Sequence, residues 1–206
     1  MIDAIKLDFV QVCKSLLERG YATGGAGNVS IKLDNGNILT TPTASSLGRL
    51  DIDRLSEVTM SGEHIAGDRP SKEVNFHLAI YRNRLKCGAI VHLHSTALSC
   101  IKNLNAENAI EPFTPYYVMR VGSLPVVPYY KPVASKISES LAELAPIHSA
   151  FLLANHGPVV CVEDLYDATN NAEELEETAK LQFMLSNHQV RYLSKKEITE
   201  LKSMSK

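Results

Sequence analysis

The sequence predicts a single domain of the α/β class, and three observations support this prediction. The chain has 206 residues, of which 45% are hydrophobic, which is enough to bury one substantial core but not comfortably two. Apolar residues recur at three- and four-residue spacing from Ile2 to Leu17 and stop at Gly20, as in an amphipathic helix that ends at a glycine. Short apolar runs at 88–94 and 150–154 have the length and composition of buried strands. We therefore expect residues 1–206 to form one domain that contains both helices and strands.

The charge and cysteine content argue against several classes of protein. The 21 basic and 23 acidic residues give a net charge of -2 and form no basic stripe, so neither nucleic acid nor a membrane surface is an expected partner. The N-terminus lacks the order of a signal peptide, and no run approaches the roughly 20 apolar residues that span a bilayer. The four cysteines include no CxxC pair and no dense disulfide framework. We therefore expect a soluble, cytoplasmic protein.

Turn residues and apolar patterns divide the first half of the chain into short elements. Residues 24–28 form a glycine-rich loop, and residues 34–37 are a hairpin turn signal. Ser71 is the expected N-cap of a helix that has Glu73 in its first turn. The expected elements are strands at 29–33 and 38–41, a polar loop at 42–48, a short helix opened by Asp51, a strand through 58–60 and the helix after Ser71.

The second half combines apolar strands with helices. Residues 111–132 hold five of the nine prolines, so we expect loops and extended segments there, with a strand at 126–127. The other expected elements are a strand at 88–94, helices at 95–103 and 134–145, strands at 150–154 and 159–162, and a helix over 163–187. The turn at 155–158 then places His156 at a break between two strands.

His92 and His94 lie two residues apart on an expected buried strand. Side chains two apart face the same side of a strand, about 7 Å from each other, so both imidazoles can reach one metal ion. The alternative is that one histidine is a hydrogen-bonded core residue and the other has no special role. Burying two imidazoles together without partners is costly, which favours the metal-binding interpretation.

His156 and Glu73 have ordinary structural explanations when each is considered alone, as a turn residue and as an acid that complements a helix dipole. His156 nevertheless follows an apolar strand, and Gly157 would let a backbone approach closely. Three imidazoles and one carboxylate form a set suited to Zn²⁺ or a similar divalent ion, with room for substrate oxygens. The predicted metal ligands are Glu73, His92, His94 and His156.

Six motifs resemble, in order, the successive motifs of the class II aldolase/adducin family, over roughly residues 20 to 185. The motifs are Gly27-Asn28-Val29-Ser30, Pro42-Thr43, Pro70-Ser71-Lys72-Glu73, His77-Leu78-Ala79-Ile80-Tyr81, Val91-His92-Leu93-His94-Ser95 and Asn155-His156-Gly157. The resemblance implies a three-layer α/β/α fold with a mostly antiparallel central sheet flanked by helices. It also implies a homotetramer with active sites at subunit interfaces, and one divalent metal per subunit, most simply Zn²⁺, with Mn²⁺ or Co²⁺ as alternatives.

The resemblance further implies a phosphate site around two loops and the start of the helix after Ser71. The residues concerned are Gly27, Asn28, Thr43, Ser45, Ser46, Ser71 and Lys72. A hydroxyl, backbone N–H groups at a helix start and a cation all favour an anion, which supports Ser71 and Lys72 independently. Their alternative interpretation is a plain N-cap and a solvated lysine.

Within the family, the segments at 21–28, 45–48, 113–117 and 153–158 are most similar to the 3-oxo-tetronate 4-phosphate decarboxylases. The expected substrate is a phosphorylated keto-sugar acid, which loses CO₂ through a metal-stabilised enediolate and gives dihydroxyacetone phosphate. One alternative is a class II sugar-phosphate aldolase that performs the retro-aldol cleavage of a fuculose-phosphate aldolase. A second alternative is a non-catalytic, adducin-like binding module, which the complete set of predicted ligands disfavours.

Three residues are expected to take part in the chemistry. Lys72 would hold the phosphate or the departing carboxylate, and Glu73 would transfer a proton when displaced from the metal. Tyr116 or Tyr117 would act as an acid in a neighbouring subunit's site; the alternative for both is packing. His77 is expected beside, but outside, the metal set. The remaining histidines are expected at the surface, namely His64, His148 and His188.

Overall fold

The computed structural model describes residues 2–98 and 109–204. Its centre is an eight-stranded sheet with the order β4-β3-β2-β1-β5-β8-β7-β6. The strands are β1 (Asn28–Lys32), β2 (Ile38–Thr40), β3 (Ser56–Val58), β4 (His64–Ala66), β5 (Ala89–His92), β6 (Val126–Val127), β7 (Ala150–Leu153) and β8 (Gly157–Val162). Every neighbouring pair is antiparallel except β6 and β7, which run parallel. The expected mostly antiparallel sheet is confirmed.

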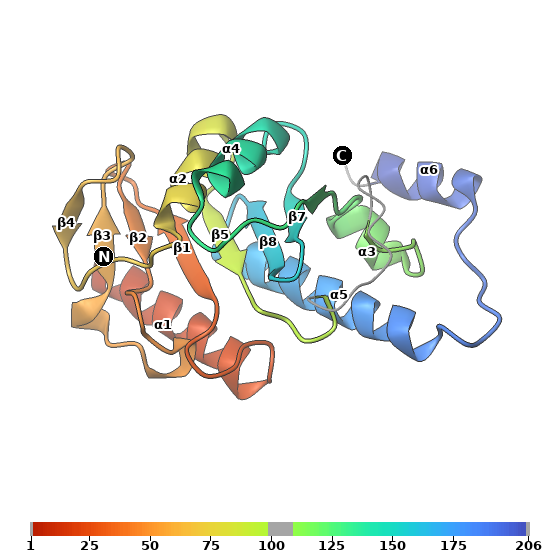
Figure 1. Cartoon of the computed structure of the whole chain (residues 1–206), viewed down its shortest axis with the longest axis horizontal. Helices are drawn as coiled ribbons and strands as arrows, with labels where there is room; N and C mark the ends of the chain where they lie inside the picture. Colours follow the sequence, from red (N-terminus) through yellow and green to blue (C-terminus); the bar gives the residue numbers. More distant parts are fainter. Residues whose placement is uncertain (1, 99–108, 205–206) are drawn as a thin grey trace.

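Helices cover both faces of this sheet (Figure 1). The α-helices are α1 (Ile2–Glu18), α2 (Val74–Asn83), α3 (Pro115–Arg120), α4 (Ser135–Leu144), α5 (Leu165–Met184) and α6 (Lys195–Met204), with 3₁₀ turns η1 (Leu47–Arg49) and η2 (Ile52–Arg54). Apolar residues of α1 and α5 pack in one core cluster, and those of α2 and α4 pack in another. The predicted three-layer α/β/α arrangement is confirmed. No helix of the described part of the chain is long and apolar enough to cross a membrane.

Strand alternation divides the central strands between the two cores. In β5, Ala89 and Val91 contribute to the α1 and α5 side, whereas Ile90 contributes to the α2 and α4 side. His92 follows the same alternation and makes an edge contact with the ring of Phe76, in α2. The predicted alternation therefore places His92 on the face of the sheet that α2 covers.

The structure corrects four sequence predictions in the elements. Residues 111–132 include the helix α3, because Thr114 accepts a hydrogen bond from the N–H of Tyr117 and Pro115 stands where a helix tolerates proline. The predicted helix at 95–103 is wrong for residues 95–97, which form no helix, and its residues 99–103 lie outside the described residues. The strand expected through 58–60 ends at Val58. Helix α2 begins at Val74, so Glu73 stands at its N-cap rather than in its first turn.

Candidate metal centre and its cavity

The adjacent central strands β1, β5 and β8 bring His92, His94 and His156 together at one end of the strands. Asn28 of β1 pairs with His92 of β5, and His92 pairs with Val159 of β8. Two glycines allow the chains to approach each other there. A Cβ on Gly27, whose φ is +82°, would lie 2.9 Å from the carbonyl oxygen of His92, and one on Gly157 would lie 2.0 Å from that of Leu93. Close packing of the backbone therefore explains why glycine occupies both positions.

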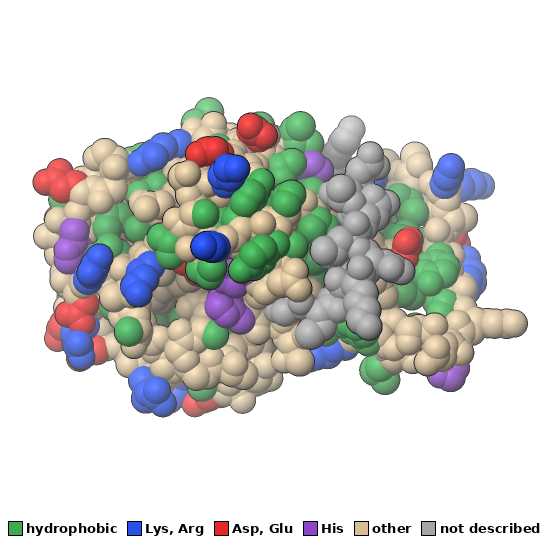
Figure 2. Space-filling model, in the orientation of Figure 1, with side chains coloured by type: hydrophobic (Ala, Val, Ile, Leu, Met, Phe, Trp, Pro, Cys, Tyr) green, Lys and Arg blue, Asp and Glu red, His purple; other side chains and the backbone are tan. Residues whose placement is uncertain are grey.

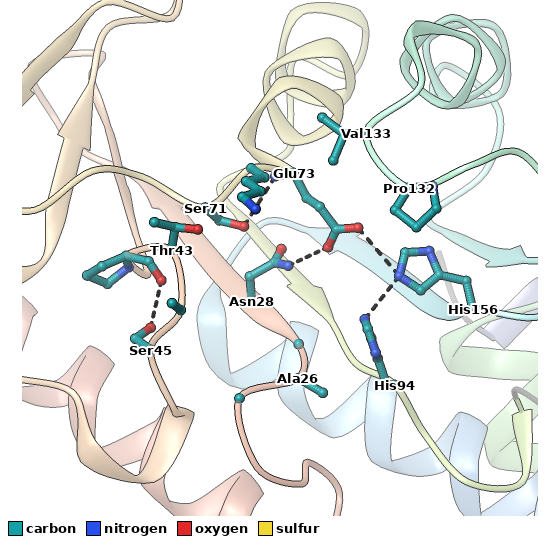
Figure 3. A pocket seen from close by; sticks show the side chains of 15 residues that line it. Ala26, Asn28, Thr43, Ser45, Ser71, Glu73, His94, Pro132, Val133 and His156 are labelled. Atoms are coloured by element: carbon teal, nitrogen blue, oxygen red, sulfur yellow. Dashed lines mark hydrogen bonds and ion pairs between the residues drawn. The ribbon is translucent and has the colours of Figure 1, made fainter.

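The four predicted metal ligands converge, and Figure 3 shows three of them, Glu73, His94 and His156. One ligand atom from each of Glu73, His92, His94 and His156 lies within 4.8 Å of all the others. The Nε2 atoms of His94 and His156 are 3.0 Å apart. Glu73 Oε1 lies 3.4 Å from His156 Nε2, and Glu73 Oε2 lies 3.5 Å from His92 Nε2. These separations bring one carboxylate and three imidazoles around a single point.

The hydrogen bonds of His92 fix which of its nitrogens faces this point. Its Nδ1 lies 2.8 Å from the carbonyl oxygen of Pro158, which can only accept, so Nδ1 carries the hydrogen. Burial, followed by the nearby His156 and His94, holds the pKa of His92 well below its usual value, so the ring is neutral and its contact with Glu73 is not an ion pair. Nε2 therefore presents a lone pair, buried and without a hydrogen-bond donor in the described structure.

This arrangement fits a divalent metal. A lone pair on His92 Nε2 facing a carboxylate oxygen of Glu73 is unfavourable unless a proton or a cation lies between them. Neutral imidazoles that donate their other N–H to a carbonyl are the usual metal-binding form of histidine. Burial and then His156 also lower the pKa of His94, which favours the neutral form needed for coordination. One carboxylate and three imidazoles form a donor set that suits a divalent transition-metal ion.

Glu73 is also held by two hydrogen bonds from outside the ligand set. The Asn28 side chain donates from Nδ2 to Glu73 Oε2 at 2.7 Å. The backbone N–H of Glu73 donates to the hydroxyl of Ser71 at 3.3 Å. Ser71 therefore caps the turn that contains Glu73 rather than α2 itself, which explains why the predicted N-cap lies earlier than the observed start of the helix.

A cavity of about 340 Å³ opens beside the four ligands. It is lined by nine of the predicted site residues: Gly27, Asn28, Thr43, Ser45, Ser71, Lys72, Glu73, His94 and His156. His92 lies behind this wall and is fully buried, whereas His94 is exposed. Figure 2 shows histidine side chains at the surface in the middle of the visible face, close to basic and hydrophobic groups. A ligand could thus reach the metal point from the side of His94.

Backbone bonds hold the predicted phosphate loop at 42–48 against the segment that precedes α2. The N–H of Thr43 donates to Arg69 and the N–H of Ser71 donates to Thr41. The N–H groups of Val74 and Phe76 are engaged within their own turns. The start of α2 therefore offers fewer free N–H groups than the sequence predicts, and an anion there would depend more on the side chains of Ser71 and Lys72.

Two predicted site residues lie elsewhere. Ser46 does not line the cavity; it lines a neighbouring one of about 230 Å³, which Ser45 also borders. Tyr117 is 1% exposed and packs in the core with α3, so its phenol does not reach this cavity. Its neighbour Tyr116 is 61% exposed and is the tyrosine that could contact another subunit.

The other histidines largely follow the sequence prediction. His64 and His188 are exposed. His148 is half-buried, with its Nδ1 2.9 Å from the hydroxyl of Ser123, so the prediction that it is a surface residue is wrong in part. His77 is buried and outside the ligand cluster, as predicted.

Sequence reasoning missed part of the cavity wall. Pro132 and Val133 line the cavity beside Glu73 and His156 (Figure 3). Val133 has a φ of +68°, which is rare for a β-branched residue. Both residues belong to a proline-rich segment, and no local pattern indicates that it passes over the ligands. The orienting carbonyl of Pro158 was also missed, because it depends on the pairing of β5 with β8.

The comparisons with known proteins agree with this geometry. The family model of the class II aldolase and adducin N-terminal domain matches residues 7–183. The 3-oxo-tetronate 4-phosphate decarboxylase of Escherichia coli K12 is 57% identical over 203 residues, covering 97% of this chain and 96% of that protein. The L-fuculose phosphate aldolase of Methanocaldococcus jannaschii is 38% identical, covering 85% of this chain and 94% of that protein.

A solved structure is similarly close. The crystal structure of YgbL from Escherichia coli superposes with a TM-score of 0.96 at 54% identity, covering 98% of this chain and 99% of that one.

Proposed function

The chain belongs to the class II aldolase and adducin family, and on that premise we propose that it decarboxylates a 3-oxo-tetronate 4-phosphate to dihydroxyacetone phosphate and CO₂. One observation carries the choice within the family. Identity to a curated 3-oxo-tetronate 4-phosphate decarboxylase is 57% over 97% of the chain, against 38% to an L-fuculose phosphate aldolase. The protein is thus a carbon–carbon lyase, and its class of substrate is a phosphorylated keto-sugar acid.

The reaction breaks the bond between C1 and C2 of the substrate. The electron pair of that bond moves towards the C3 keto oxygen as CO₂ leaves, and a proton then adds to C2. When bound between Glu73 and the three histidines, a divalent ion supplies the electrophilic polarisation that this electron movement requires. Zn²⁺ is our proposal for that ion, because imidazole and carboxylate donors in this number suit it.

The chain's own residues bind and orient the substrate. Among the described residues that line the cavity, Lys72 carries the only formal positive charge, so it is the group that attracts the substrate's phosphate or carboxylate. The hydroxyls of Thr43 and Ser71 line the same wall and can donate to phosphate oxygens. The substrate's C3 end then lies towards His94 and His156. A cavity of about 340 Å³ is at the small end of the range for ligand sites, which suits a four-carbon acid.

Glu73 is the proposed residue for proton transfer. Its carboxylate lies in the cavity wall within 3.4 Å of His156 and receives a hydrogen bond from Asn28. When displaced from the metal and protonated by solvent, a carboxyl group at this point can donate that proton to C2 after CO₂ has left. Tyr116 could take this role from a neighbouring subunit, because it is exposed.

The remaining proposals concern the assembly and location of the protein. We propose a homotetramer with sites at subunit interfaces, in which case the exposed side chains of Tyr116, Tyr129 and Val133 would meet another copy.

A cytoplasmic location stays a prediction. It is supported by the free thiols of Cys13, Cys87 and Cys161, which a reducing compartment would preserve.

The test is to measure CO₂ and dihydroxyacetone phosphate released from freshly generated 3-oxo-tetronate 4-phosphates of both C2 configurations. We expect equal amounts of both products, loss of release with a chelator, and recovery when Zn²⁺ or Mn²⁺ is added back. His188→Ala is the matched control for ligand variants, because His188 is an exposed histidine outside the ligand cluster.

The alternatives give different products. An aldolase would cleave fuculose 1-phosphate to an aldehyde and dihydroxyacetone phosphate without CO₂. A binding module would turn over neither substrate at any metal loading, and either result would overturn the decarboxylase proposal.

A further inference from the structure

A buried chain of hydrogen bonds leads from α2 to Glu73. Tyr81 and Ser30 are joined through their hydroxyls at 2.9 Å, and Ser30 Oγ lies 2.7 Å from His77 Nδ1. His77 Nε2 lies 2.7 Å from Asn28 Oδ1, and Asn28 Nδ2 lies 2.7 Å from Glu73 Oε2. None of the first four side chains in this series exceeds 5% exposure. The series thus connects the buried interface between β1 and α2 to the wall of the cavity.

Two regular elements produce this series by their periodicity. Asn28 and Ser30 are two residues apart on β1 and so face the same side of the sheet, towards α2. Glu73, His77 and Tyr81 follow at intervals of four residues, so they lie along one face of the turn and helix that contain them. Strand β1 and the turn and helix that pack on it therefore contribute alternate members of one hydrogen-bonded series. We call this series the polar seam; its members are Tyr81, Ser30, His77, Asn28 and Glu73.

The donors and acceptors that each side chain offers fix the direction of the hydrogen bonds in the seam. The ionised carboxylate of Glu73 can only accept, so Asn28 must present its Nδ2 there and its carbonyl oxygen to His77. That oxygen also only accepts, so His77 donates from Nε2. A neutral imidazole has one N–H, and therefore Nδ1 accepts from Ser30, whose oxygen in turn accepts from Tyr81. All four bonds donate towards Glu73.

The neutral state of His77 supports this assignment. Burial lowers the pKa of His77 to about 3, so the ring carries a single N–H near neutrality. The opposite direction would turn the Asn28 oxygen towards the Glu73 carboxylate, which would place two acceptors 2.7 Å apart.

We propose that His77 is a positioning residue that sets the Asn28 carboxamide with its Nδ2 hydrogens towards Glu73 and the cavity. One of these hydrogens holds the Glu73 carboxylate in its ligand orientation (Figure 3). The other is available to an oxygen of the substrate, because Asn28 lines the cavity. The effect on turnover rests on the proposed function, whereas the tautomer of His77 does not.

Two polar substitutions separate positioning from simple packing. The amide nitrogen of glutamine in His77→Gln can occupy the place of Nε2 and keep the donor to Asn28. The shorter amide in His77→Asn reaches only the place of Nδ1, so it keeps the contact with Ser30 and loses the one with Asn28. We expect kcat/KM to fall about tenfold in His77→Asn, the effect of losing about one hydrogen bond, and less than threefold in His77→Gln. Equal losses in both variants would refute positioning.

The tautomer is measured without any assay of activity. Nitrogen-15 NMR of histidine-labelled protein, with Zn²⁺ and with a chelator, should show His77 protonated at Nε2 and not at Nδ1. A ring protonated at Nδ1 would overturn the inference, even if the wild-type protein decarboxylates. If the wild type shows no decarboxylation but His77 is protonated at Nε2, the proposed function fails and the direction of the seam stands.

A second variant covers the case in which His77→Asn does not fold. Ser30→Ala removes the donor to Nδ1 and leaves the ring in place, so Nδ1 loses its partner while the contact of Nε2 with the Asn28 oxygen keeps the ring protonated at Nε2, and kcat/KM should fall less than threefold. A ring that becomes protonated at Nδ1 in Ser30→Ala would show that Asn28 does not fix the tautomer, and it would contradict the proposed direction.

Discussion

His92 and His94 are two residues apart but differ in their surroundings. His92 is the last residue of β5, is fully buried, and is held by the carbonyl of Pro158. His94 lies beyond the end of the strand and is exposed. Strand alternation therefore led to the correct pairing, although only His92 lies in the strand and His94 reaches the ligand cluster from the segment after it.

We predict different consequences for the two alanine variants. His94→Ala should weaken Zn²⁺ binding by more than about 100-fold, since loss of outer partners alone costs about 10–100-fold. Its metal-free stability should change by no more than about 0.5 kcal/mol, because the side chain is exposed. His92→Ala should also lower metal-free stability by about 1–3 kcal/mol, because it leaves a cavity and removes one of the two hydrogen bonds that the Pro158 carbonyl accepts.

Metal content by mass spectrometry and urea unfolding in a chelator check this prediction, with His188→Ala as the control. If His94→Ala retained one tightly bound Zn²⁺ per chain, His94 would not be a ligand. Equal metal-free stabilities of the two variants would contradict the structural role of His92.

Single residues also show what the sequence could and could not predict. The ligand set could be predicted because histidines and an acid stand in recognisable motifs. The position of Tyr117 could not, because Thr114 and Pro115 start a helix that turns its side chain into the core. The direction of the Asn28 amide depends on His77, 49 residues away in sequence, and so has no local signal.

At the scale of elements, strongly amphipathic segments were predicted well. Helices α1, α4 and α5 were found where apolar periodicity placed them. Strand β4 and helix α6 were missed because none of their residues is fully buried and their apolar signal is short. In α6 only Ile198 and Leu201 pack against the core, and two apolar residues are too few to identify a helix from sequence.

Helix α5 reaches the site through a buried acid. Glu176 is 3% exposed, and its carboxylate accepts from the N–H groups of Ala97 at 2.9 Å and Leu98 at 3.2 Å. These N–H groups belong to the segment that directly follows His94. We infer that Glu176 holds this segment against α5 and so fixes where His94 stands.

We predict that Glu176→Ala weakens Zn²⁺ binding about tenfold and lowers the free energy of unfolding by about 1–3 kcal/mol, because two buried N–H groups lose their acceptor. Glu176→Gln keeps one carbonyl oxygen and should lose less of both. Glu177→Ala is the matched control, because its neighbouring carboxylate is exposed and makes only surface contacts. Zinc titration and urea unfolding give the two quantities, and an effect no larger than that of Glu177→Ala would rule out this role.

At the scale of the whole molecule, the site depends on contacts between distant parts of the chain. Its cavity combines the loop before β1, the loop after β2, the start of α2, the end of β5 and the loop that carries Pro132 and Val133. The fold class follows from local patterns and family motifs, which is why it could be predicted. The cavity requires the strand order β1-β5-β8, which no local pattern specifies.

The buried seam also makes the stability of the fold depend on pH. His77 has a pKa of about 3 in the folded protein, against about 6.5 for an exposed histidine. Between these values the unfolded chain binds more protons than the folded one, so the free energy of unfolding rises with pH. The contribution of His77 is therefore fully present above about pH 6.5 and is lost progressively as the pH falls towards 3, by about 1.4 kcal/mol per pH unit.

We predict that this slope disappears when His77 is replaced by a residue that does not titrate. Urea unfolding in a chelator between about pH 4 and pH 6 should give a wild-type curve steeper than that of His77→Gln by about 1.4 kcal/mol per pH unit. His92, His94 and His148 also have lowered pKa values and add the same sign, but they are present in both proteins and cancel in the difference. Parallel curves would mean that His77 is protonated as readily in the folded as in the unfolded chain, and they would contradict its burial as a neutral ring between β1 and α2.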